Sequence, residues 1–99
     1  MKRIYSISEI ESLVAPIARM YGAKRVALFG SYARGKARLD SDIDLYIDKG
    51  KIKGFFQLAG FQRELEEKFS VPVDVLTTGA LSDEFLNRIK KEEIVLYEQ

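Results

Sequence analysis

Apolar residues recur at helical spacing near the start of the chain. The members of this stripe, three or four positions apart, are Ile10, Leu13, Val14, Ile17 and Tyr21. The spacing predicts an amphipathic helix with one face turned toward a core. Ser8 and Glu11 have the spacing of a capping box at its start, and Gly22 is typical of a helix end.

A second helical stripe lies in the middle of the chain and predicts a helix over 55–69. The residues expected on its buried face are Phe55, Leu58, Phe61, Leu65 and Phe69. Phe56 falls roughly opposite this face, next to the basic turn 49–54, and is expected to be exposed. Such a side chain either contacts a partner protein or is exposed without consequence.

Short apolar runs between the helical segments predict four strands. They cover residues 25–29, 43–47, 71–76 and 94–97. Pro72 places the third run at a sheet edge or at a strand start, because proline cannot donate a hydrogen bond. A further helix begins after Ser82, with acidic residues in its first turn and lysines in its last, as the helix dipole favours. This order predicts an α+β fold, a two-layer α/β arrangement of helices on a small mixed sheet.

The chain of 99 residues contains neither cysteine nor histidine. Its length fits one domain over 1–99 with one modest core. The missing residue types exclude disulfides, thiolate nucleophiles, zinc sites built on sulfur and an imidazole base. If the chain is an enzyme, its chemistry must come from carboxylates, hydroxyls, arginines, lysines and a recruited metal ion.

Sixteen basic and fifteen acidic residues give a net charge of +1, so stable nucleic-acid binding is not expected. No apolar run approaches the roughly 20 residues of a membrane span, and we expect a cytoplasmic protein without membrane contact. Positive charge is nevertheless concentrated, since residues 24–53 contain eight basic and four acidic side chains. That excess suits a polyphosphate ligand, although a solvated basic surface would give the same count.

Asp42 and Asp44 are two positions apart at the start of a predicted strand, so their side chains leave the same face of the sheet. Carboxylates this close repel each other unless one is protonated or a cation lies between them. A hard cation with oxygen ligands, such as Mg²⁺, relieves the repulsion, and a plain polar turn is the alternative. Asp74 is a third acidic residue, inside the apolar run 71–76, where burial requires a cation, a proton or a partner such as lysine.

The predicted strand 25–29 ends at Gly30-Ser31 and continues into a short helix. Backbone N–H groups at such a turn, together with the Ser31 hydroxyl, can donate hydrogen bonds to phosphate oxygens. Arg34 and Lys36 follow in the same loop and are candidate phosphate ligands. Each feature alone is common in structural turns. Combined with the aspartates, they predict a site for a metal ion and a triphosphate.

Gly30-Ser31, ten intervening residues, Asp42-x-Asp44 and the later Asp74 resemble the motif of the minimal nucleotidyltransferases of the DNA polymerase beta superfamily. The resemblance covers essentially the whole chain. It implies that the three aspartates are catalytic and bind two Mg²⁺ ions, and that the Gly-Ser pair binds the phosphates of a nucleotide such as ATP. It also implies in-line attack of an acceptor hydroxyl on the α-phosphorus while pyrophosphate leaves.

The chain further resembles the antitoxin half of toxin–antitoxin pairs whose toxin is a small helical HEPN-domain ribonuclease. In those pairs the antitoxin transfers AMP from ATP to a tyrosine of the toxin, which implies a protein adenylyltransferase here. Two alternatives stay open. One is a non-catalytic nucleotide-binding antitoxin that neutralises its partner by steric association, and the other is an enzyme that nucleotidylates a small molecule or an RNA end.

Overall fold

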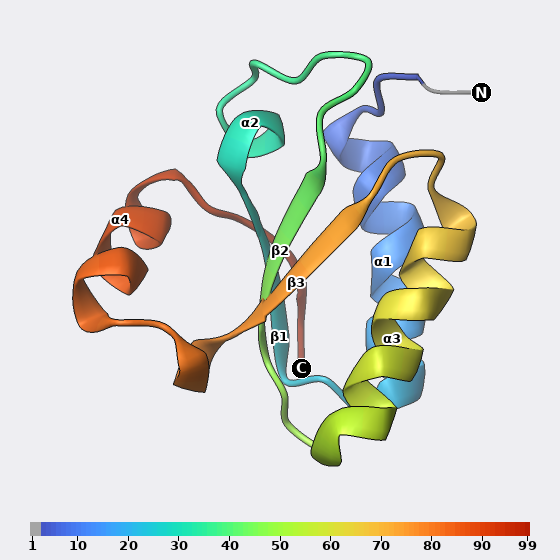
Figure 1. The fold of residues 1–99 in the computed structure, drawn as a ribbon, viewed down its shortest axis with the longest axis vertical. Helices are drawn as coiled ribbons and strands as arrows, with labels where there is room; N and C mark the ends of the chain where they lie inside the picture. The colour runs from blue at the N-terminus through green and yellow to red at the C-terminus, as the bar shows by residue number, and fades with distance from the viewer. Residues whose placement is uncertain (1–2) are drawn as a thin grey trace.

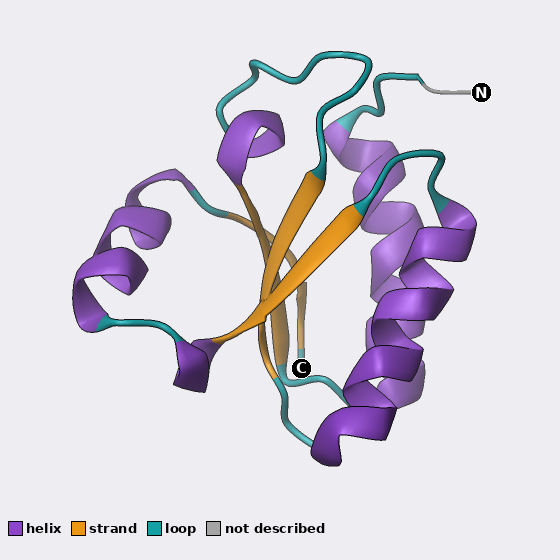
Figure 2. Cartoon of the chain, in the orientation of Figure 1, coloured by secondary structure: helices purple, strands orange, loops and turns teal. Residues whose placement is uncertain are grey.

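Two long helices, α1 (Ile7–Tyr21) and α3 (Gly54–Lys68), lie side by side against one face of a sheet in the computed structural model, which describes residues 3–99 (Figure 1). The four strands are β1 (Arg25–Phe29), β2 (Ile43–Asp48), β3 (Val73–Thr77) and β4 (Ile94–Glu98). The remaining elements are the short helix α2 (Gly30–Ala33), a 3₁₀ turn η1 (Thr78–Ala80) and α4 (Asp83–Glu92). Helix α4 covers part of the other sheet face (Figure 2), and the predicted α+β fold is confirmed. None of the helices within residues 3–99 is long and apolar enough to span a membrane.

The sheet is mixed, with the strand order β3-β2-β1-β4. Strand β1 pairs antiparallel with β2 and β4, whereas β2 pairs parallel with β3. Strand β3 therefore lies at an edge, and Pro72 directly precedes it, as its missing N–H group requires. Ile43, Leu45 and Ile47 of β2 are fully buried in the core beneath α1 and α3. The alternate residues of β2 consequently face the side that α4 only partly covers.

The capping box of α1 lies two residues earlier than the sequence predicts. Ser6 is the N-cap, its hydroxyl accepts a hydrogen bond from the Glu9 N–H (3.0 Å), and the Glu9 carboxylate accepts one from the Ser6 N–H (2.9 Å). Two overlapping Ser-x-x-Glu pairs fit the motif equally well, so Ser8–Glu11 was the wrong choice. The earlier start is favoured because it buries Tyr5 against the core, where its hydroxyl accepts a hydrogen bond from the Ser70 N–H (2.8 Å).

The first turn of α3 also differs from the prediction. Phe55 was expected on the buried face but is 78% exposed, because the buried contacts of α3 begin only at Leu58 and centre on Phe61 and Leu65. Phe56 is 88% exposed, as expected. The two neighbouring phenylalanine rings contact each other edge to face, with centroids 6.0 Å apart.

The position of the helix start can be tested with two matched serine variants. Ser6→Ala removes the cap of α1 and should lower the free energy of unfolding by about 1 kcal/mol. Ser8→Ala, on an exposed position inside the same first turn, should change it by less than about 0.5 kcal/mol. Denaturant titrations would measure both values. Equal losses, or a larger loss for Ser8→Ala, would contradict the assigned N-cap.

Candidate active site

The pairing of β2 with β3 brings two of the predicted catalytic residues together. The parallel register aligns Asp44 with Asp74, so their side chains leave the same sheet face from neighbouring strands. Asp42 lies two residues before Asp44, just outside β2, and is exposed. The expectation that Asp74 is buried was wrong. It is exposed because β3 is an edge strand and the contacts of α4 with β3 begin only at Leu76.

Gly30 lies directly beside Asp44. The antiparallel register aligns Phe29 with Asp44, and Gly30 then starts α2 with a left-handed φ of +77°. A Cβ atom at this position would collide with Oδ2 of Asp44. Glycine is thus required here both by the backbone conformation and by the close approach of the carboxylate. The sequence motif and the site geometry agree at this residue.

The neighbouring acids perturb Asp44. The pKa of its carboxyl group is raised to about 6, first by burial and then by the negative charges of Asp74 and Asp42, while Arg34 opposes the shift. A carboxylate with this pKa is partly protonated near pH 6 and carries an unfavourable charge at higher pH. Perturbed acids of this kind are frequent at functional sites, because a ligand is expected to compensate the charge.

The predicted phosphate-binding residues occupy different settings. Ser31 is half-buried in α2, directly after Gly30, whereas the Arg34 guanidinium reaches Glu92 of α4, with 3.0 Å between Nη1 and Oε2. The same Glu92 oxygen accepts a hydrogen bond from the Gly30 N–H, also at 3.0 Å. Lys36 is exposed in the following loop, and no ion pair of its side chain is present within residues 3–99. Its predicted role stays a prediction.

Glu92 was not found by sequence reasoning, although the chain carries a signal for it. The last turn of α4 contains Lys90 and Lys91, which suit the negative end of the helix dipole, but Glu92 does not. Glu93, the next residue, is also acidic and pairs with Arg25 at 2.7 Å. Acidic residues at a helix C-terminus are disfavoured by the dipole, so a nearby cation is expected to compensate each of them.

The donor set of the aspartate site suits a hard divalent cation. Asp42, Asp44 and Asp74 offer only carboxylate oxygens, which Mg²⁺ prefers, and their mutual repulsion favours bound positive charge. Within residues 3–99, however, no three His, Cys, Asp or Glu side chains already surround one metal position. Mg²⁺ commonly keeps several waters and binds through one or two carboxylates together with substrate phosphates, so a complete protein cage is not needed.

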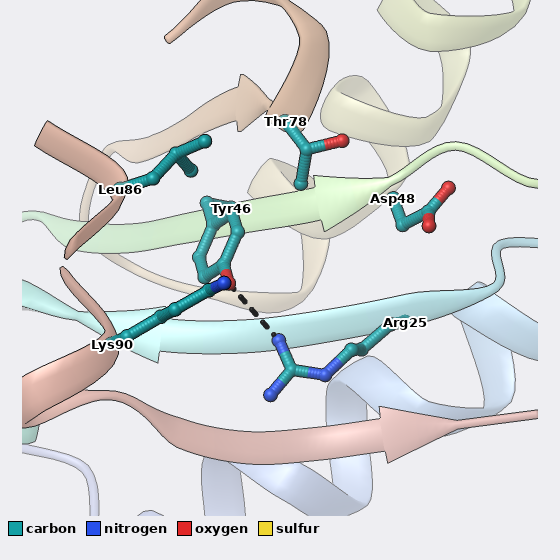
Figure 3. Close-up of a pocket in the computed structure, with 6 residues that line it drawn as sticks. All are labelled: Arg25, Tyr46, Asp48, Thr78, Leu86 and Lys90. Carbon is teal, nitrogen blue, oxygen red and sulfur yellow. Dashed lines mark hydrogen bonds between the residues drawn. The ribbon is translucent and has the colours of Figure 1, made fainter. Parts of the chain in front are cut away.

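A cavity of about 420 Å³ opens further along the same sheet face (Figure 3). Its lining residues are Arg25, Tyr46, Asp48, Thr78, Leu86 and Lys90. The Arg25 guanidinium donates a hydrogen bond to the Tyr46 hydroxyl (3.1 Å) and is neutralised by Glu93. The cavity contains one carboxylate, that of Asp48, and so lacks the acidic cluster found around Asp44.

Comparison with known proteins gives the family. Residues 14–99 match the model of the family described as Polymerase beta, Nucleotidyltransferase. The chain belongs to this family. The polymerase beta nucleotidyltransferase fold and the enzyme class predicted from the aspartate and Gly-Ser motif are thereby confirmed.

The chain is similar to one curated relative and to two solved structures in particular. The chain is 37% identical over 89 residues to the Methanocaldococcus jannaschii protein named "Putative protein adenylyltransferase MJ0435", covering 90% of this chain and 96% of that one. A solved structure described as a "putative minimal nucleotidyltransferase" is 29% identical, covers 91% of this chain and 95% of that one, and has a TM-score of 0.79. A chain from the complex of tri-AMPylated Shewanella oneidensis HEPN toxin with MNT antitoxin shares the fold, with a TM-score of 0.72, 16% identity and coverage of 94% and 73%.

The close approach at Gly30 can be tested against a second glycine. Gly30→Ala introduces both left-handed strain and a collision with Asp44, whereas Gly35→Ala, at φ +73°, introduces strain in open space. Strain alone costs about 1 to 2 kcal/mol, and Gly30→Ala should cost about 1 kcal/mol more, because the Asp44 side chain must also shift. Denaturant unfolding of both variants measures the difference. Similar losses would show that the Asp44 carboxylate moves aside at little cost, which would contradict a fixed contact with Gly30.

The raised pKa of Asp44 predicts a pH-dependent stability. Its folded pKa of about 6 exceeds the ordinary aspartate value near 4, so between these values the folded protein binds more protons than the unfolded chain. Stability therefore falls as the pH rises through this window. Without divalent metal at pH 7.5, the free energy of unfolding of Asp44→Asn should exceed that of the wild type by about 1 kcal/mol, after discounting for partial exposure. Near pH 4 the two proteins should have equal free energies of unfolding, as denaturant titrations would measure.

Asp48→Asn, which removes one carboxylate from the same strand and sheet face, is the matched variant for this measurement. A difference between Asp44→Asn and the wild type that stays constant from pH 4 to 7.5 would contradict the shifted pKa.

Proposed function

We propose that this nucleotidyltransferase transfers AMP from ATP to a hydroxyl group of a partner protein, a tyrosine of a HEPN-type toxin, and thereby acts as its antitoxin. The relative named "Putative protein adenylyltransferase MJ0435" supports AMP as the transferred group. The fold shared with a chain from the complex of an AMPylated HEPN toxin and its MNT antitoxin supports the class of partner. The observation that carries the proposal is the in-register pairing of Asp44 with Asp74 beside Gly30.

The aspartates provide the metal-binding part of the proposed site. Asp42, Asp44 and Asp74 would hold two Mg²⁺ ions, which would supply neutralisation of phosphate charge and activation of the acceptor hydroxyl. Their oxygen-only donor set and the raised pKa of Asp44 support this role. Asp44 is the least exposed of the three, so its charge has the greatest need of a counter-ion.

The turn after β1 provides the phosphate-binding part. Gly30 has no side chain to block a close approach to the backbone, and the Ser31 hydroxyl can donate to a phosphate oxygen. The Arg34 guanidinium lies close enough to Asp44 to lower its pKa, so it can interact with phosphates held at the aspartates. Lys36 would add positive charge from the same loop. These donors stabilise the charge that develops on the leaving pyrophosphate.

Asp74, the exposed member of the Asp44–Asp74 pair, is the proposed proton acceptor. As the acceptor oxygen attacks the α-phosphorus and the bond to pyrophosphate breaks, the Asp74 carboxylate accepts the proton of the acceptor hydroxyl. Asp42 and Asp74 are both exposed, which leaves the site open to a macromolecular acceptor. A tyrosine on a partner protein could therefore enter without a second domain of this chain around it.

The experiment combines the purified protein, the product of its neighbouring open reading frame, ATP and Mg²⁺, and follows the intact mass of each chain. The partner should gain one or more AMP groups. Asp44→Asn and Asp74→Asn should slow this gain at least about 100-fold, because each removes a carboxylate from the reacting centre. Asp48→Asn, which keeps the same strand and face, should leave the rate unchanged.

Other outcomes would overturn the proposal in distinguishable ways. Inhibition of the partner without a gain in mass would favour neutralisation by steric association. Transfer of AMP to an RNA end or a small molecule, with the partner unmodified, would favour the other acceptor classes. Full activity in Asp44→Asn would show that the reacting centre lies elsewhere.

A further inference from the structure

Glu92 binds two groups that belong to the proposed phosphate site. Its Oε2 atom accepts hydrogen bonds from the Gly30 N–H and from Nη1 of Arg34, both at 3.0 Å. The two donors stand at either end of α2, and the carboxylate reaches them from the last turn of α4. One oxygen of Glu92 thus accepts hydrogen bonds from two groups, the Gly30 N–H and the Arg34 guanidinium, that are proposed to face a triphosphate.

The contact is built from partly exposed groups. The side chain of Glu92 is 29% exposed and that of Arg34 is 49% exposed, so water can replace either partner when the pair separates. The neighbouring pair is different, because the Glu93 side chain is only 13% exposed and accepts two hydrogen bonds from Arg25, at 2.7 and 3.1 Å. Glu93 and Arg25 therefore form a structural pair, whereas Glu92 and Arg34 can exchange partners.

A bound triphosphate conflicts with Glu92 in two respects. The Gly30 N–H can donate one hydrogen bond, and it already donates this bond to the Glu92 carboxylate. Phosphate oxygens that approach Arg34 also meet a carboxylate within hydrogen-bond distance of the same guanidinium, and the two negative charges repel. The α-phosphate of AMP alone lacks the β- and γ-phosphates that would extend along this turn.

We propose that Glu92 is an internal competitor of the triphosphate: it satisfies Gly30 and Arg34 in the nucleotide-free protein and is displaced when ATP binds. This inference rests on the proposed function. Glu92 should therefore weaken the binding of ATP without affecting the binding of AMP. The same contact keeps the Arg34 side chain beside the site while no nucleotide is present.

The test compares the dissociation constants of ATP and AMP, each with Mg²⁺, by calorimetry. Glu92→Gln keeps an acceptor oxygen for both donors but removes the charge, so ATP should bind about five-fold more tightly and AMP equally well. Glu93→Gln is the matched control at the adjacent position. It should lower stability through Arg25 without changing the ratio of the two constants.

A second measurement uses the wild-type protein alone. In ¹H–¹⁵N spectra, ATP should shift the Gly30 amide resonance strongly as Glu92 leaves, and AMP should shift it much less. Unchanged or weaker ATP binding in Glu92→Gln, or equal shifts by ATP and AMP, would overturn the inference alone. If neither the wild type nor the variant binds any nucleotide, the proposed function fails and the inference fails with it.

Discussion

The parallel pairing of β2 with β3 is the constraint on which the site depends. In a parallel pair the aligned residues point to the same face, so alignment of Asp44 with Asp74 leaves two carboxylates side by side. Nothing in the core needs acidic residues there, since the opposite face of β2 carries the apolar side chains that pack beneath α1 and α3. The carboxylates of Asp44 and Asp74 therefore repel each other in the folded protein. A bound cation would relieve this repulsion and would in turn attract a triphosphate.

The surroundings of Asp44 show the same principle. Gly30 removes the side chain that would otherwise separate the carboxylate from the α2 backbone. Glu92, at the end of α4, accepts hydrogen bonds from the Gly30 N–H and the Arg34 guanidinium. Arg34 is thus paired with Glu92 and not with Asp44, whose pKa stays raised. A site in this state is prepared for a ligand that carries both cations and phosphates.

Much of the fold could be predicted because periodicity and turn residues agree with each other. The strands at 25–29 and 43–47 and the cap at Ser82 follow directly from local sequence. The helix start at Ser6 could not be chosen over Ser8 locally, since burial of Tyr5 decides between them. The exposure of Phe55 likewise depends on where α3 first meets the sheet.

The candidate site also has a part that local sequence predicts and a part that depends on the packing of distant segments. Sequence spacing predicts Gly30, Ser31, Asp42 and Asp44, which lie close together in the chain. It could suggest Asp74 but not its exposure, which follows from the position of β3 at the sheet edge. Glu92 is separated from Gly30 by 62 positions, and only the packing of α4 brings it near. Contacts between distant segments are the part that local patterns cannot supply.

The central claim is that the charge of Asp44 is unfavourable in the free protein and is compensated by a divalent cation. Titration of its side-chain carboxyl carbon by NMR, with and without Mg²⁺, tests this claim directly. We expect a pKa of about 6 without metal and a clear fall when Mg²⁺ is added. A carboxyl group that titrates near its ordinary value and does not respond to Mg²⁺ would contradict it.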